Sequence, residues 1–290
     1  MRKIAAVLLR RSVDFEVRND KDFLWPKAQP DVKLMIKNGL LQSMAQTQTQ
    51  LCKAIGNIAA SLACYVCDPN ESPEGWNDLL PCLMQMWALS GAEAARQRET
   101  AINVLAQVVL PMKATIRAQQ GQLATLLQAG FADQDAMVRA STVNLVCEMV
   151  EAWEKEEWTP LQPVLPVMLE CIKSCGQDEN ALKCILEALV STADEEPNFF
   201  KPRMGDFIKF FQALAIDKNV DETHRVIALE WMIAVAEGKK KTLIKWVPDV
   251  CEDIIGTCME MMMECEDEDD WLGRLYDEEG DDDDTAFAAG

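Results

Sequence analysis

The side chains of this chain that could bind a charged partner are mainly carboxylates, and they are concentrated near its end. Between Glu264 and Asp284 the sequence carries thirteen acidic residues and one arginine, so this segment has a net charge of −12. The net charge of all 290 residues is −20. Four large apolar residues interrupt the run: Trp271, Leu272, Leu275 and Tyr276. Acidic runs are usually solvated spacers, but a spacer has no use for apolar groups that could anchor a partner.

We therefore expect the acidic segment to dock a basic protein, because a dense anionic segment raises the encounter rate with such a partner. The residues expected to make the contact are Asp267, Glu268, Asp269, Asp270 and Trp271. A solvated spacer remains the alternative. The segment lacks the alternating Asp/Asn, central Gly and terminal Glu of an EF-hand, so calcium binding is not expected. The net negative charge also disfavours direct binding to nucleic acid.

No arrangement of residues indicates a catalytic centre. The single histidine, His224, stands at the start of an expected helix, where it should face solvent. No Ser or Cys has a recognisable base beside it, and no phosphate-binding or dinucleotide-binding glycine pattern is present. Cys64 and Cys67 have the spacing of zinc ligands but lack the second half of such a site. We therefore expect no enzyme activity, no metal and no cofactor.

The segment from Asp133 to Cys175 indicates which elements carry the polar side chains. Apolar or small residues recur at helical spacing from Val138 to Trp153, and again from Leu161 to Cys175. A short polar link, Glu154 to Thr159, separates the two halves. Neither amphipathic helix can bury its apolar side alone, so the two are expected to fold back on each other.

The rest of the chain repeats this unit of two helices. Alignment on a basic residue near the start of each second helix gives intervals of 45, 41, 44 and 42 residues. The aligned bases are Lys53, Arg98, Arg139, Lys183 and Arg225. A proline, which a first helical turn tolerates, lies at or near the start of each first helix: Pro30, Pro81, Pro111, Pro160, Pro202 and Pro248. A period near 43 residues is typical of HEAT or armadillo-type solenoids, and two helices per unit favour HEAT.

The turn DQDAMVR resembles the Asp-x-x-Val-Arg turn of HEAT repeats at Asp135, Val138 and Arg139. Its carboxylate is expected to favour the helix N-terminus and to pair with the base four residues on.

A ladder of polar residues follows from the same alignment. Four or five positions after the aligned bases stand Asn57, Asn103, Asn144, Glu187 and Glu230. Stacked repeats would place these residues in a row on one surface. With Glu148 and Glu151, the ladder is expected to receive an extended basic peptide, because Asn can bind peptide backbone and Glu can pair with Lys. An ordinary solvated helix face is the alternative.

We predict an all-α, right-handed HEAT-repeat superhelix over residues 1–264, followed by an acidic, disordered segment over residues 265–290. Helix pairs are expected at 31–66, 77–109, 112–153, 160–194 and 202–237. A helix over 2–16 without a preceding partner and a helix over 242–264 without a following one would form a half-repeat at each end. The chain is therefore expected to be a segment of a longer solenoid.

The core and the cellular compartment follow from composition. Trp87, Trp153, Trp231 and the Met259–Met263 cluster are expected to pack in helix stripes. Eleven cysteines without tight clusters indicate reduced core residues of a cytosolic or nuclear protein. The apolar runs are shorter than the ~18 residues of a membrane span, and MRKIAAVLLRR lacks the features of a signal peptide. Lys239–Lys241 is expected to be a solvated helix-end cluster rather than a localisation signal.

With the repeats and the acidic run both in view, the sequence resembles the importin-β (karyopherin-β) superfamily of nuclear transport receptors, in its importin subunit beta-3 branch. The residues that carry the resemblance are AAVLLRR (Ala5–Arg11) and ECEDEDDWLGRLYDEEGDDDD (Glu264–Asp284). The family has an acidic loop with an embedded tryptophan inside one repeat, and Asp267–Trp271 has that form.

The resemblance implies a monomeric receptor that carries basic or lysine-rich cargo through the nuclear pore and releases it to the GTP-bound small GTPase Ran. The second helices would line the concave side, and Phe-Gly nucleoporins would dock between helices on the convex side. The acidic segment would engage a basic patch on Ran or influence cargo release. The receptor would shuttle between cytoplasm and nucleus, with no nucleic-acid or membrane partner. A different HEAT scaffold, such as a phosphatase regulatory subunit, is the alternative.

Overall fold

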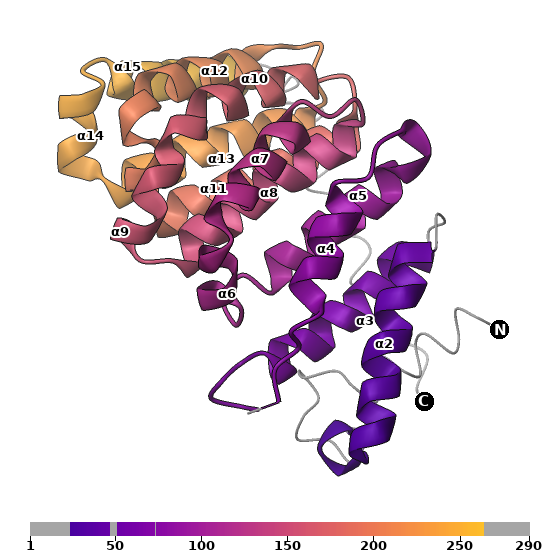
Figure 1. Ribbon diagram of the computed structural model, residues 1–290. Coiled ribbons are helices and arrows are strands. Elements are labelled where there is room, and N and C mark those ends of the chain that lie inside the picture. The colour runs from indigo at the N-terminus through magenta and orange to yellow at the C-terminus, as the bar shows by residue number, and fades with distance from the viewer. Residues whose placement is uncertain (1–23, 47–50, 73, 264–290) are drawn as a thin grey trace, which may run out of the picture.

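The computed structural model describes residues 24–46, 51–72 and 74–263, and every regular element in these ranges is a helix (Figure 1). Five antiparallel pairs follow one another along the chain. They are α2 (Pro30–Gln46) with α3 (Leu51–Val66), α4 (Leu79–Trp87) with α5 (Ala95–Gln107), α7 (Gln120–Phe131) with α8 (Ala136–Ala152), α10 (Leu165–Ser174) with α11 (Glu179–Glu195), and α12 (Met204–Ile216) with α13 (Glu222–Gly238). The predicted all-α solenoid of five helix pairs is confirmed.

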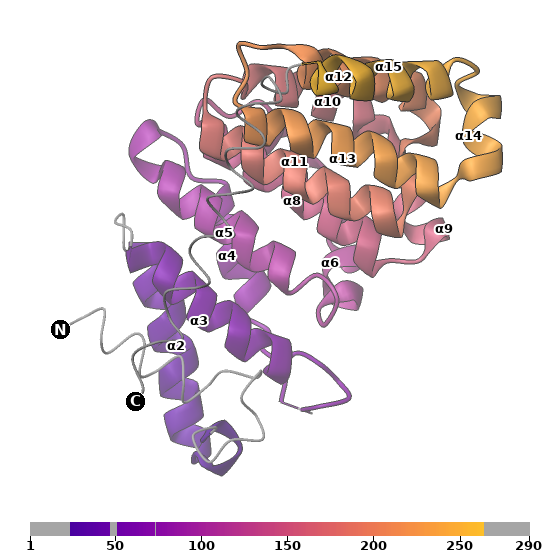
Figure 2. The same cartoon turned by 180° about the vertical axis from the view of Figure 1, so that it is seen from behind.

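The helices form two layers. The second helices α3, α5, α8, α11 and α13 each pack against the next, and Figure 2 shows α8, α11 and α13 side by side. The first helices form the other layer, in which α12 packs against α15 (Val250–Met262). Adjacent second helices contact one another along more of their length than adjacent first helices do. The second helices therefore form the more closely packed side of the stack, which is called the concave surface below.

Short elements modify the predicted boundaries at three places. A separate short helix, α6 (Lys113–Ala118), precedes α7. The link after α8 contains α9 (Lys155–Trp158), which Glu154 and Glu157 stabilise as a capping box. A 3₁₀ segment, Thr159–Val164, then delays the start of α10 to Leu165. Proline is tolerated at the start of α10, because the N–H groups of a first helical turn have no carbonyl partner within the helix.

The single helix predicted over 242–264 is wrong, because the structure has α14 (Lys240–Trp246) and α15 separated by three residues. Pro248 explains the break, since a proline disfavours helical geometry in the residue before it. Val247 accordingly adopts an extended backbone, with φ −136° and ψ 97°. The helix predicted over 2–16 lies outside the described residues.

Aromatic rings form the core of the last full repeat. Trp87, Trp153 and Trp231 are buried as predicted. Trp231 stacks on Phe211 at 4.3 Å between ring centroids, and Phe200 meets the same indole edge-on at 5.3 Å. Aromatic pairs of this kind contribute about 0.5–1.5 kcal/mol each beyond the area they bury.

Two packing predictions are wrong. Met259, Met262 and Met263 are 60–83% exposed, because α15 packs through the opposite face, which carries Val250 and Thr257. The described residues include no helix that covers the methionine face. His224 was expected to face solvent but is 5% exposed, with its Nε2 atom 3.1 Å from the carbonyl oxygen of Glu179. The close contact between α11 and α13 buries it.

The aligned bases join successive repeats. Arg98 donates two hydrogen bonds to the Asp133 carboxylate, at 2.7 and 2.9 Å, and two more to the carbonyl oxygens of Leu89 and Gly91. Both side chains are about nine-tenths buried. Lys53 on α3 pairs with Glu99 on α5 at 2.5 Å. A buried charge must be paired to be tolerated, so these two contacts fix the α2–α3 repeat on the α4–α5 repeat, and the α4–α5 repeat on the α7–α8 repeat.

The HEAT-like turn behaves only partly as predicted. Asp135 caps α8 by accepting hydrogen bonds from the backbone N–H groups of Met137 and Val138. Arg139 does not pair with this carboxylate. It donates instead to the carbonyl oxygens of Asp133 and Gln134 and, across the repeat boundary, of Ser174. The Asp135 carboxylate accepts the backbone hydrogen bonds of the cap. Carbonyl groups without a partner at helix ends accept from Arg139 instead.

Gly130 on α7 provides a test of how closely α7 approaches α8. A methyl group at Gly130 would overlap the buried side chain of Thr142, whose hydroxyl donates to the carbonyl oxygen of Val138 at 2.8 Å. Gly130→Ala is therefore expected to destabilise the protein by about 1–3 kcal/mol, measured by urea unfolding followed by circular dichroism. Gly121→Ala in the same helix meets open space, so it should be neutral or stabilise by up to about 1 kcal/mol. Equal effects of the two changes would contradict this packing.

Candidate functional site

The predicted polar ladder lies on the second helices, one residue on each. Asn57 is exposed on α3, Asn103 and Asn144 are half-buried on α5 and α8, and Glu187 and Glu230 are exposed on α11 and α13. Because these five helices are consecutive neighbours in one layer, the ladder crosses the concave surface. That the ladder binds a peptide stays a prediction.

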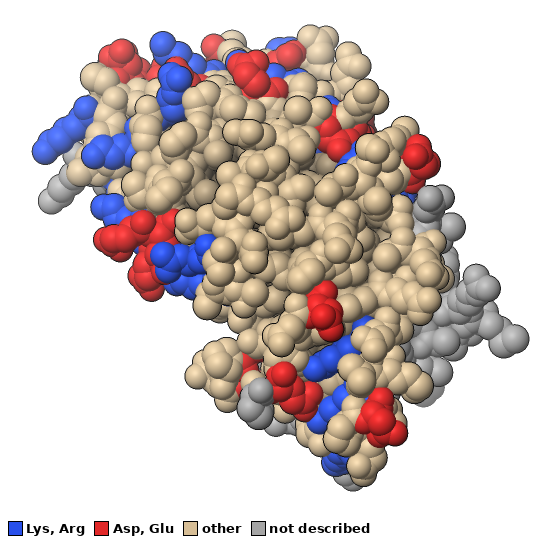
Figure 3. All heavy atoms as spheres, in the orientation of Figure 1, with Lys and Arg blue, Asp and Glu red and all other residues tan. Residues whose placement is uncertain are grey.

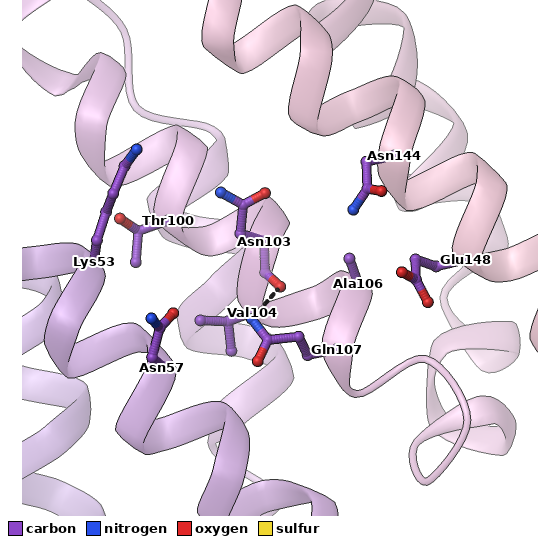
Figure 4. A pocket seen from close by; sticks show the side chains of 9 residues that line it. All are labelled: Lys53, Asn57, Thr100, Asn103, Val104, Ala106, Gln107, Asn144 and Glu148. Carbon is purple, nitrogen blue, oxygen red and sulfur yellow. Dashed lines mark hydrogen bonds between the residues drawn. The ribbon is translucent and has the colours of Figure 1, made fainter. Parts of the chain in front are cut away.

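Three of the five ladder residues meet in one pocket of about 300 Å³ (Figure 4). Asn57, Asn103 and Asn144 line it, from three successive helices. The remaining lining residues are Lys53, Thr100, Val104, Ala106, Gln107 and Glu148. Glu187 and Glu230 do not line this pocket and continue the row on the next two helices. The pocket and this continuation are called the concave groove below.

The floor of the pocket is small and apolar, and its walls are amides. Val104 and Ala106 are buried beneath it, and Figure 4 shows Ala106 between Asn103 on α5 and Glu148 on α8. The side chain of Gln107 donates to the backbone carbonyl of Asn103 at 3.2 Å. Within the described part of the chain, the three asparagine amides make no hydrogen bond. Each can therefore both donate to and accept from a ligand's backbone.

Carboxylates stand at the α8 end of the pocket. Glu148 has no basic partner among the side chains that the structure describes. Burial, and then the neighbouring charge of Glu151, raise the pKa of the Glu148 carboxyl above its ordinary value. Glu151 accepts hydrogen bonds from the hydroxyls of Ser191, at 3.1 Å, and Thr192, at 2.7 Å, on α11. A cationic ligand group would supply the partner that Glu148 lacks.

The analysis of the sequence missed three of the pocket's polar residues, Lys53, Thr100 and Gln107. Gln107 lies four positions after Asn103, one helical turn further on, so helical spacing could have indicated it. Lys53 was recognised as an aligned base but not as a wall of the pocket. Glu151 was expected to face a ligand, but its carboxylate is engaged by α11.

The acidic docking residues Asp267–Trp271 lie outside the described residues, so their role stays a prediction. In the described ranges no group of three or more potential ligands could hold a metal ion, and Cys64 and Cys67 are not joined in a disulfide. None of the described helices is long and apolar enough to cross a membrane.

Two further grooves lie outside the concave groove, the first of them between two first helices. One, of about 540 Å³, separates α10 from α12, with Leu165, Leu169, Phe207 and Phe210 as its apolar part. The other, of about 610 Å³, lies beside the Arg98–Asp133 pair where α4 approaches α7. Neither α4 nor α7 contains a charged residue, and in Figure 3 the middle of this face is largely uncharged, with charged side chains mainly around its margins.

Comparison with known proteins gives consistent matches along the chain. A family model described as "IPO5-like, TPR repeats" matches residues 43–210, and one described as "Importin repeat" matches residues 217–290. Importin subunit beta-3 of Saccharomyces cerevisiae is 23% identical over 271 residues, which cover 89% of this chain and 24% of that protein.

Solved structures of Kap121p share the fold. The crystal structure of Kap121p bound to Pho4p has a TM-score of 0.74 at 20% identity, and the match covers 91% of this chain and 24% of that one. Kap121p alone and Kap121p bound to Nup53p each give a TM-score of 0.71 at 18% identity, over 91% and 92% of this chain and 26% of theirs. The chain thus spans about a quarter of the length of these relatives.

The fold is that of a superhelical HEAT-type solenoid. Its sequence matches add the family: the chain belongs to the importin-β family, in the IPO5-like group. The resemblance stated from the sequence is confirmed, and the phosphatase-scaffold alternative is set aside.

Glu148→Gln tests the electrostatics of the pocket. A raised pKa means that the folded chain holds this proton more tightly than the unfolded chain, so deprotonation disfavours the folded state. The penalty is absent below the unfolded carboxyl pKa, near 4, and complete above the raised pKa. Glu148→Gln should therefore give a small gain in urea midpoint at pH 7 that disappears below about pH 4. The exposed Glu170→Gln is the control, and a gain independent of pH would contradict the assignment.

Proposed function

We propose that this chain is a segment of a nuclear import receptor that binds basic cargo proteins on its concave surface. Membership of the importin-β family supports the general role. The single observation that carries the binding site is the row of free asparagine amides followed by carboxylates across successive second helices. In this proposal the solenoid acts by shape and charge, without a catalytic centre or cofactor.

The proposed mechanism uses two kinds of contact. The amides of Asn57, Asn103 and Asn144 bind the backbone of an extended cargo segment. Glu148, Glu187 and Glu230 pair with its lysine or arginine side chains. Each exposed ion pair contributes about 0.2–1 kcal/mol, so useful affinity requires several repeats at once. A stack whose repeats touch only their neighbours can bend to bring those repeats onto one ligand.

Ran and the nuclear pore complete the proposal. Asp267–Trp271 binds a basic patch on GTP-bound Ran or influences cargo release, and Ran shifts the solenoid to a form with lower cargo affinity. The receptor shuttles as a monomer between cytoplasm and nucleus. The family resemblance and the charge of the segment support these steps.

Reversing charge on the ladder tests the cargo site. Glu187→Lys with Glu230→Lys should weaken binding of a fluorescent lysine-rich peptide by about tenfold, because two attractive contacts become repulsive. Fluorescence anisotropy measures the dissociation constant. Glu170→Lys, on the first helix α10, changes the net charge by the same amount as each of these substitutions. Glu170 lies outside the concave groove. Equal losses in the double variant and in a matched convex pair, Glu170→Lys with Asp206→Lys, would assign the effect to net charge alone.

We also propose that the groove between α10 and α12 binds Phe-Gly segments of nucleoporins. Its apolar part includes Leu169 and Phe210, both half-buried at the surface. Its rim alternates charges, with Glu170 and Lys173 paired at 2.7 Å and Arg203 and Asp206 paired at 3.1 Å. A phenyl ring would be buried between the two helices while the polar spacer of the nucleoporin stays hydrated.

Leu169→Ala with Phe210→Ala should reduce capture on beads carrying a Phe-Gly repeat peptide by fivefold or more, about 1 kcal/mol or greater. Val167→Ala is the matched control, because Val167 is 48% exposed on the same helix but does not line the groove. Undiminished capture by the double variant would exclude this groove.

A further inference from the structure

Two parts of the concave groove, the α3–α5 end and the α8–α11 end of its pocket, differ in the sign of their exposed charge. At the end formed by α3 and α5, Lys53 and Arg96 flank the single carboxylate of Glu99, at 2.5 and 3.9 Å. Both cationic side chains are 38% exposed, whereas the Glu99 side chain is 5% exposed. The cations outnumber the carboxylate and lie between it and solvent, so this end presents positive charge.

The end formed by α8 and α11 has the opposite sign. Glu148, Glu151 and Glu187 are the carboxylates there. The one base on α11 is Lys183, 3.8 Å from Glu187, and the one base on α8, Arg139, donates to the backbone carbonyls of Asp133, Gln134 and Ser174. Glu148 and Glu151 lie one turn apart on α8 and face the same side. The carboxylate oxygens of Glu151 are engaged by α11, but its negative charge adds to the attraction of Glu148 for a ligand cation.

Uncharged amides separate the two ends. Asn57, Asn103, Gln107 and Asn144 occupy the pocket between Lys53 and Glu148 (Figure 4). Packed helices lie about 8–10 Å apart, so α3 and α8 are separated by about 16–20 Å. An extended chain advances about 3.3 Å per residue. About six ligand residues therefore connect one end of the pocket with the other.

We infer that the concave groove selects an extended segment with a charge asymmetry: lysine or arginine at the α8–α11 end, and an uncharged or acidic stretch about six residues away, beside Lys53 and Arg96. This inference rests on the proposed peptide-binding function and narrows it. A uniformly lysine-rich segment would place a cation against Lys53 and Arg96, and the repulsion there would cancel part of the gain at Glu148. The preferred cargo segment is thus the margin of a basic cluster rather than its middle.

The test uses three labelled octapeptides of identical composition, with two lysines, two aspartates and four serines. The first has Lys-Lys at its amino end and Asp-Asp at its carboxyl end, the second has the reverse order, and the third alternates the charges. All three have zero net charge, so general attraction to this acidic chain cancels. One of the first two, selected by the ligand's direction in the groove, should bind the full chain about fivefold or more tightly than the alternating peptide.

Two variants locate the effect. Glu148→Gln with Glu187→Gln should remove the preference for lysine at the α8–α11 end. Lys53→Gln with Glu99→Gln should weaken the preference for aspartate at the α3–α5 end. The two residues are changed together so that the buried Glu99 carboxylate is not left without its lysine. Glu170→Gln should leave the preference intact. Circular dichroism of each variant checks that it is folded.

A lysine-rich octapeptide measured in parallel distinguishes failure of the charge asymmetry from failure of the proposed cargo binding. If it binds and the three neutral peptides bind equally, the charge asymmetry is overturned while the proposed cargo binding stands. If neither it nor any neutral peptide binds, the proposed function fails for this groove and the inference fails with it. If the preference persists in both groove variants, the asymmetric site lies elsewhere and the inference is overturned.

Discussion

The structure depends on one requirement: each amphipathic helix has to cover its apolar face with its neighbours in the stack. In the part of the chain that the structure describes, the helices do not gather around a common centre, and each second helix packs against its neighbours in the layer. Where the contact also contains charge, a buried pair fixes the register, as Arg98 and Asp133 do across one repeat boundary. Residues at equivalent positions therefore fall into a row without any specific contact between them, and the concave groove is a by-product of this packing.

Most of the architecture could be predicted from the sequence because two periods are independent of tertiary detail. The 3.6-residue pattern identifies each helix, and the interval near 43 residues identifies the pair. The ladder followed from the same alignment, since equal positions in stacked units share a face. What failed were features decided by single residues: the break at Pro248, and the burial of His224, which depends on how closely α13 approaches α11.

The candidate site was less predictable than the fold because its properties depend on exposure. Lys53, Arg96 and Glu99 look in the sequence like an ordinary mixture of charges. Only the packing of α3 on α5 buries the carboxylate and leaves the two cations at the surface. Arg139 illustrates the same point, since its carbonyl acceptors include one from the next repeat, which no local pattern indicates.

The spacing of the second helices has a consequence for the conformation of any bound chain. Equivalent positions on neighbouring second helices lie about 8–10 Å apart. A polyproline II helix repeats every three residues, or about 9.3 Å. The spacing of the helices and the repeat of the polyproline II helix are therefore similar. A ligand in that conformation would present every third side chain to the equivalent position on the next second helix. A β-strand alternates its side chains with a period of two and would drift out of phase. If the groove binds a peptide as proposed, a ligand that repeats every three residues fits it better than one that repeats every two.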